Sequence, residues 1–227
     1  MASHTPVRLS EHTWPEIKAA LDDGTTTAIV AVGSVEQHGP HLPVIMDTLA
    51  GDELSRRIAD RLGDALAAPT IRPGCSGHHM AFPGSITISP ETLMDLVRGV
   101  NTVAPEIARE IDASVIAIAD LDENMRLMNE GLREAGVEYE EPVIHAGAAE
   151  TAIVLAVNEG LVRTDELAVG HEGEVSASRL LSEGFDAISE NGVLGDPREG
   201  TAEAGEAILE RITTAYTERI EAERDAA

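Results

Sequence analysis

Two short apolar segments, Thr26–Val32 and Ala113–Ala119, are rich in alanine and β-branched residues. Such runs are typical of strands that are buried on both faces of a parallel sheet. Helical periodicity alternates with them, as in Thr48–Leu66, whose apolar residues recur every three or four positions. This alternation predicts a single domain over residues 1–227, an α/β fold with three layers (α/β/α) and a mostly parallel central sheet.

The remaining elements follow from capping residues, glycines and periodicity. Pro105 is expected to kink or split a helix that begins at Pro90 and runs to about Ile111. Short strands are predicted over Pro69–Arg72 and Ser85–Ser89. Further helices are predicted over Trp14–Leu21, Glu123–Ala135, Glu150–Asn158 and Thr201–Arg224.

Acidic residues dominate the charge, with 41 Asp+Glu against 16 Lys+Arg and a formal net charge of -25. This composition argues against nucleic acid and anionic membrane surfaces as partners, because both are bound by clustered cations. An excess of acidic residues is compatible with binding of metals or cationic partners. We favour an acidic surface adapted to high salt, as in a haloarchaeal protein, because salt screens the repulsion between like charges.

Cysteine content and hydropathy bear on the compartment. Cys75 is the single cysteine, so an intramolecular disulfide is excluded and a reducing, cytoplasmic environment is the natural interpretation. The chain has no run of roughly 18 apolar residues that would span a membrane. Its first ten residues lack the apolar core of a signal peptide.

Residues 33–43 read Gly-Ser-Val-Glu-Gln-His-Gly-Pro-His-Leu-Pro, and an aspartate follows at position 47. In an extended segment Glu36 and His38 point to the same side, so a carboxylate and an imidazole converge on one point. Asp47 could bridge two ions there, and mixed oxygen and nitrogen ligands suit Zn²⁺ or Mn²⁺. Alternatively, the polar residues of this Gly/Pro-rich loop only hydrogen-bond to one another.

This segment resembles the signature of the creatininase (creatinine amidohydrolase) family, in which the same motif precedes a metal-binding aspartate. The resemblance implies that Glu36, His38 and Asp47 are metal ligands. It implies one or two divalent ions per chain, Zn or Mn, with Fe as a further candidate. It also implies a homo-oligomer, commonly a hexamer in this family.

Two further segments resemble the family. Residues 77–85 are similar to its H-x-x-F-P-G-T loop, with Ser85 at the usual threonine position, and His79 is the matching histidine. Residues 145–151 are similar to its H-A-G-x-x-E-T segment, which implies that Glu150 is a metal ligand and that His145 lies near the substrate. Either His145 or His79 is then a candidate for moving a proton to the leaving nitrogen.

One departure concerns the family's H-G-G-N or H-Y-E-N loop, whose histidine is a metal ligand. In one alignment Leu121 stands at the histidine position, and Glu123 then becomes a candidate catalytic residue or substitute ligand, as do its acidic neighbours. In the other alignment, which we favour, Val100-Asn101-Thr102 marks an internal deletion that removes this loop. Either way, the usual histidine is absent.

The family's chemistry implies hydrolysis of C–N bonds in a small amide, either a cyclic amide or a formamide, by metal-activated water. Aromatic residues make up only 2% of the chain, which makes creatinine itself a doubtful substrate. The missing histidine leaves a second hypothesis open. In it, the chain is a degenerate member that acts as a binding or scaffolding subunit.

Overall fold

The computed structural model describes residues 7–98, 116–138, 145–173 and 175–226. The labelled helices and strands are α1 (Trp14–Asp22), β1 (Thr27–Ile29), α2 (Met46–Leu62), β2 (Ala65–Ala67), α4 (Leu121–Glu134), α5 (Ala148–Asn158), α6 (Ala177–Glu183) and α7 (Ala202–Asp225). A further helical segment, which carries no label, covers residues 90–98.

In the described residues the sheet consists of β1 and β2, which pair in parallel with Ala28 opposite Leu66. Isolated bridges extend this pairing, parallel between Val32 and Ile71 and antiparallel between Val35 and Ile86. The predicted strand over Thr26–Val32 is therefore shorter than expected, and Pro69–Arg72 contributes a bridge and no strand.

The boundary between α2 and β2 differs from the prediction. We expected a helix over Thr48–Leu66, but α2 ends at Leu62 because Gly63 adopts a left-handed conformation with φ 77°. Glycine takes this conformation without steric cost and commonly ends a helix. The chain then turns directly into β2, three buried residues of which the first two, Ala65 and Leu66, lie inside the range predicted as helix.

Several predicted features lie outside the described residues. They include the helical part beyond residue 98 with Pro105, the site of the predicted deletion at Val100–Thr102, and the first three residues of the predicted strand Ala113–Ala119. The described part of that strand, residues 116–119, has no regular secondary structure.

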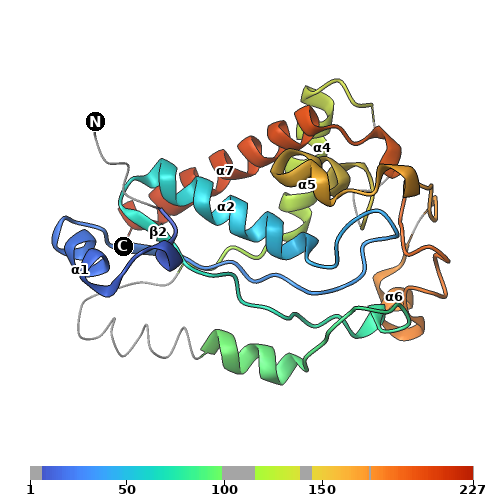
Figure 1. Cartoon of the computed structure of the whole chain (residues 1–227), viewed down its shortest axis with the longest axis horizontal. Coiled ribbons are helices and arrows are strands. Elements are labelled where there is room, and N and C mark those ends of the chain that lie inside the picture. Colours follow the sequence, from blue (N-terminus) through green and yellow to red (C-terminus); the bar gives the residue numbers. More distant parts are fainter. Residues whose placement is uncertain (1–6, 99–115, 139–144, 174, 227) are drawn as a thin grey trace.

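Helices lie on both sides of the extended segments that leave β1 and β2. Figure 1 shows α2 and α7 on one side and the helix of residues 90–98 on the other. The main core lies where α7 packs against α5 and α4, with Ile208, Leu209 and Ile212 of α7 fully buried. The approach is close at Gly205, where an added Cβ would lie 1.9 Å from the carbonyl oxygen of Ala152.

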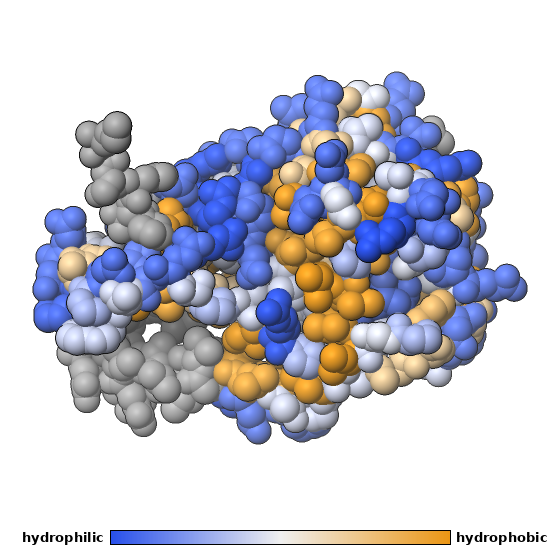
Figure 2. All heavy atoms as spheres, viewed as in Figure 1, coloured by the Kyte–Doolittle hydropathy of each residue, from blue (hydrophilic) through white to orange (hydrophobic). Residues whose placement is uncertain are grey.

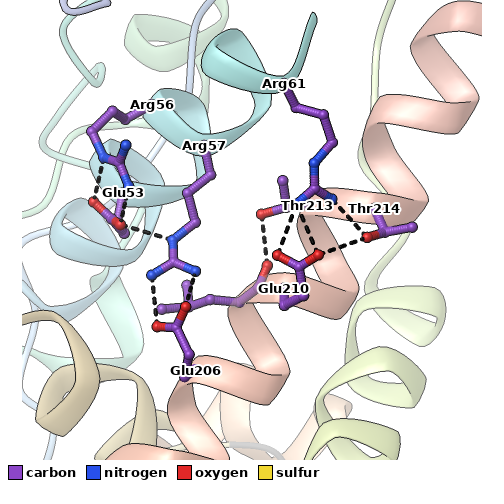
Figure 3. A network of polar contacts seen from close by, with 9 residues as sticks. Glu53, Arg56, Arg57, Arg61, Glu206, Glu210, Thr213 and Thr214 are labelled. Atoms are coloured by element: carbon purple, nitrogen blue, oxygen red, sulfur yellow. Dashed lines mark hydrogen bonds and ion pairs between the residues drawn. The ribbon is translucent and has the colours of Figure 1, made fainter.

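A polar network fixes α2 against α7 (Figure 3). Arg57 donates two hydrogen bonds to Glu206 at 2.6 and 2.7 Å, and Glu53 accepts from both Arg56 and Arg57. One turn later, Arg61 pairs with a further glutamate of α7. Bidentate Arg–carboxylate pairs impose geometry as well as attraction. They hold α2, and with it the start of that helix, in a defined position on the core.

The surface is largely hydrophilic, but Figure 2 shows apolar residues gathered in the middle of the viewed face. Large apolar side chains that are at least half exposed include Val32, Ile86 and Leu121. Contiguous apolar surface of this kind commonly marks a protein interface. Among the described residues, no helix has the length and apolar character needed to cross a membrane.

Candidate metal centre

The loop before α2 is held on both sides by backbone hydrogen bonds. Gly33 donates its N–H to the carbonyl of Ile71, and Glu36 donates to the carbonyl of Val44 at 2.9 Å. Gly33 packs so closely on the start of α2 that an added Cβ would lie 3.1 Å from the backbone of Thr48. These contacts place the loop beside Asp47, which lies in the first turn of α2.

His38 is buried, with 1% of its side chain exposed, and its two nitrogens have different environments. Nδ1 lies 3.1 Å from the carbonyl oxygen of Glu36, which can only accept, so Nδ1 carries the proton of the neutral ring. Nε2 has no hydrogen-bond partner among the described residues. It lies 3.7 Å from Asp47 Oδ1 and 3.7 Å from Glu150 Oε2.

These separations fit a metal ion better than direct hydrogen bonds. A nitrogen–oxygen distance of 3.7 Å is too long for a hydrogen bond. With bonds of about 2.0–2.2 Å, two ligands of one tetrahedral Zn²⁺ lie about 3.4 Å apart. His38, Asp47 and Glu150 therefore form a group able to hold a divalent ion. Glu36, His38 and His145 form a second such group.

Hydrogen bonds fix both carboxylates that face His38. The hydroxyl of Ser34 donates to Asp47 Oδ2, which leaves Oδ1 directed to His38. The backbone N–H of Ala146 donates to Glu150 Oε2 at 2.5 Å. Ala146 has a positive φ of 52°, a conformation that is uncommon for residues other than glycine and that occurs often at functional sites.

The site carries more negative charge than it can keep without a cation. Burial raises the pKa of Glu150 to about 7, although His38 acts in the opposite direction. Burial likewise raises the pKa of Glu36. Burial lowers the pKa of His38, but Glu150 and Asp47 outweigh that effect and raise it to about 9. A proton or a metal ion on His38 Nε2 therefore compensates the facing carboxylates.

A second cluster adjoins this centre and contains His79 and His145, both of which pack on Phe185. The ring centroids of His38 and His145 are 4.2 Å apart, and those of His79 and His145 are 4.7 Å apart. Burial lowers the pKa of His79 to about 3 and that of His145 well below its usual value. Both rings are therefore neutral at ordinary pH. His79 Nε2 lies 3.3 Å from Glu36 Oε1.

Of the sequence-predicted residues, Glu123 is not brought to this centre. It lies in the first turn of α4, exposed, with its carboxylate bound to Arg126 at 2.7 and 2.9 Å. Asp120 caps the same helix by accepting from the backbone N–H of Glu123. Ser34, Gln37 and Phe185 were not predicted from the sequence as site residues. The first two lie within the quoted motif, whereas no local pattern marks Phe185.

Comparison with known proteins places this arrangement in a family. The model of the creatininase family (creatinine amidohydrolase) matches residues 10–104 and 99–220. The chain belongs to the creatininase family. The two matched ranges meet at residues 99–104, where the favoured alignment places the deletion.

Curated relatives in the family carry two different names. The chain is 34% identical to a mycofactocin precursor peptide peptidase from Mycolicibacterium smegmatis, over 85% of this chain and 83% of the relative. It is 25% identical to a creatinine amidohydrolase from Pseudomonas putida, over 90% and 92% of the two chains. A crystal structure of creatinine amidohydrolase (creatininase) superposes with a TM-score of 0.77 at 22% identity, over 96% and 98% of the two chains. The predicted α/β fold is thus confirmed as that of the creatininases.

Proposed function

We propose that this chain is a metal-dependent hydrolase that cleaves a C–N bond in a small amide, and that residues 1–227 form one such domain. The observation that carries the proposal is the unpartnered Nε2 of buried His38, which faces two carboxylates at 3.7 Å. Membership in the creatininase family supports the same chemistry. A non-catalytic scaffold is not favoured, because it gives no reason to maintain buried charges that are costly without a cation.

In this proposal, His38, Asp47 and Glu150 hold a divalent ion, Zn or Mn, with Fe as a third candidate, and Glu36 contributes to a second position beside Asp47. When bound, such an ion polarises the substrate carbonyl and lowers the pKa of water. The neutral ring of His145 can accept a proton and then donate it to the leaving nitrogen. Glu123 has no role in the proposed chemistry, because its carboxylate is exposed and bound to Arg126.

The substrate class has two candidates. A formamide or cyclic amide fits the family's description as creatinine amidohydrolases. The amide bond of a peptide is the second candidate, and the specific observation in its favour is the higher identity to the peptide peptidase, 34% against 25%.

We extend the proposal to the setting of the enzyme. A cytoplasmic homo-oligomer, hexameric as the family resemblance implies, accounts for the half-exposed Val32, Ile86 and Leu121, which a second copy can cover. The net charge of -25 supports a high-salt environment and argues against nucleic acid and anionic membranes as partners.

The test is an assay of protein freed of metal and reloaded separately with Zn²⁺ and Mn²⁺ in high salt. The substrates are a panel of formamides, cyclic amides and short peptides, and release of the amine is measured. Asp47→Asn is the matched control, because it keeps the shape of the side chain and removes its charge. We expect turnover of at least one amide by the wild type and none above background by the variant. Equal rates in both proteins, or no turnover by either loaded protein, would contradict the proposal.

A further inference from the structure

The side-chain amide of Gln37 is buried at the junction of the two histidine clusters, and backbone groups define its orientation. Its Oε1 accepts from the N–H of Gly39 at 2.8 Å, and its Nε2 donates to the carbonyl of Gly192 at 3.2 Å. A backbone N–H only donates and a carbonyl only accepts, so the amide cannot be turned over without losing both bonds. Gly192 is required here, because an added Cβ would lie 2.1 Å from Gln37 Oε1.

The second hydrogen of this amide goes to His79. Gln37 Nε2 lies 3.1 Å from His79 Nδ1, so Nδ1 is the acceptor and must be unprotonated. The proton of the neutral ring then lies on Nε2, the atom that is 3.3 Å from Glu36 Oε1. In this tautomer the protonated Nε2 of His79 lies beside the Glu36 carboxylate and has no lone pair to offer to a metal.

The backbone of the same residue orients His145. The carbonyl oxygen of Gln37 lies 2.8 Å from His145 Nε2 and can only accept, so Nε2 carries the proton. Gln37 Nε2 is also 3.1 Å from His145 Nε2, but two donors do not bond, and both hydrogens of the amide are already used. The free lone pair of His145 is therefore on Nδ1.

We propose that Gln37 is a positioning residue that fixes the tautomers of His79 and His145 and so gives these two buried histidines different roles. His79 keeps a protonated Nε2 beside the Glu36 carboxylate, and His145 keeps Nδ1 as a proton acceptor. His38 takes the opposite tautomer to both, because its Nδ1 donates to the carbonyl of Glu36. This inference rests on the proposed function for the meaning of the roles, but the tautomers themselves can be measured without any substrate.

The assignment has a consequence for the missing histidine ligand. His79 Nε2 lies 3.3 Å from Glu36 Oε1, but in this tautomer it is protonated and cannot serve as a metal ligand. The second candidate group, Glu36 with His38 and His145, therefore gains no ligand from His79.

The experiment is a long-range ¹H–¹⁵N spectrum of the full chain labelled with ¹⁵N-histidine, recorded with and without Zn²⁺, for the wild type and Gln37→Met. In the wild type we expect Nε2–H at His79 and His145, and Nδ1–H with zinc-bound Nε2 at His38. In Gln37→Met, His79 should become a mixture of tautomers, whereas His145 and His38 should keep theirs, because backbone carbonyls hold them. His78→Gln is the matched control, removing a neighbouring ring and leaving the Gln37 amide in place.

If His79 in the wild type is protonated on Nδ1, the proposal is wrong. This result needs no variant, so the proposal can be tested even if Gln37→Met folds poorly. An unchanged His79 tautomer in a folded Gln37→Met protein would overturn it as well. Zn²⁺ affinity is the second measurement, and Gln37→Met should weaken it by less than about tenfold, the low end for loss of an outer hydrogen bond. If the wild type shows the expected tautomers but binds no zinc, this inference holds and the proposed function is contradicted.

Discussion

Several helices begin with an acidic residue in the first turn, but among the described residues only α2 and α5 bring theirs to the candidate centre. Asp47 of α2 and Glu150 of α5 face the unpartnered Nε2 of His38. Glu123 of α4 instead faces Arg126 and solvent, as an ordinary partner of a helix N-terminus. Acidic residues at helix starts are therefore not informative alone. What distinguishes the first pair is burial against a nitrogen whose lone pair has no other use.

The largest expected difference between the two regions is in metal affinity. His38→Ala should weaken Zn²⁺ binding by more than about 100-fold, because it removes a ligand and not an outer hydrogen bond. Glu123→Gln, the matched change at the start of α4, should leave the affinity unchanged. Competition with a chromogenic chelator measures both. Similar losses in the two variants would break the distinction between the regions.

A pH series sharpens the same distinction. Zinc must displace the proton from His38, whose pKa is about 9, so affinity should rise about tenfold per pH unit between pH 7 and 9. Below pH 7 the slope should steepen, because Glu150, with a pKa of about 7, is then protonated as well. The pKa of Glu123 is lowered by its bond to Arg126, so it adds nothing in this range. An affinity independent of pH would show that neither group is a ligand.

How much of this could be predicted from the sequence depends on the range of the interactions. The motif at residues 33–43 and the periodicity of the helices are local, so the sequence predicts the fold class and the convergence of His38 with Asp47. The roles of Gln37 are set by His79, His145 and Gly192, which lie 42, 108 and 155 residues away along the chain. No spacing rule marks such contacts.

The exposure of Glu123 was equally hidden, because its acidic neighbours occur in the same pattern at functional helix starts. Arg126 lies three residues further along the same helix, so this ion pair follows from local spacing. Only the tertiary structure shows that, among the described residues, no histidine faces Glu123. The strand boundaries failed for a different reason. Gly63 ends α2 early, and the short β2 then takes residues whose apolar character fits a helix equally well.

A smaller effect is expected for the residue that orients Asp47. Ser34→Ala removes the hydroxyl that donates to Asp47 Oδ2 and should weaken Zn²⁺ binding about tenfold, as loss of an outer-shell partner does. Ser34→Thr, which keeps the hydroxyl, should retain most of the affinity. Isothermal titration with zinc measures both variants. A Ser34→Ala protein that binds zinc as the wild type does would show that Asp47 needs no orienting bond.

The smallest effect is expected at the start of α4. Asp120→Ala removes the side chain that caps this helix and should lower the free energy of unfolding by about 1 kcal/mol. Because α4 supplies no group to the candidate centre, zinc affinity should stay at the wild-type value. Urea unfolding of the metal-free protein and zinc titration measure the two quantities. A loss of zinc affinity would place the start of α4 in the site after all.

The most direct test of the centre is the amount of Zn, Mn and Fe bound per chain, measured by mass spectrometry on protein purified in high salt. Wild type and Asp47→Ala are compared, since Asp47 faces both His38 and the loop that carries Glu36. We predict at least one ion per chain in the wild type and a small fraction of that in the variant. No specifically bound metal in the wild type, or an equal amount in both proteins, would contradict the account of this site as a metal centre.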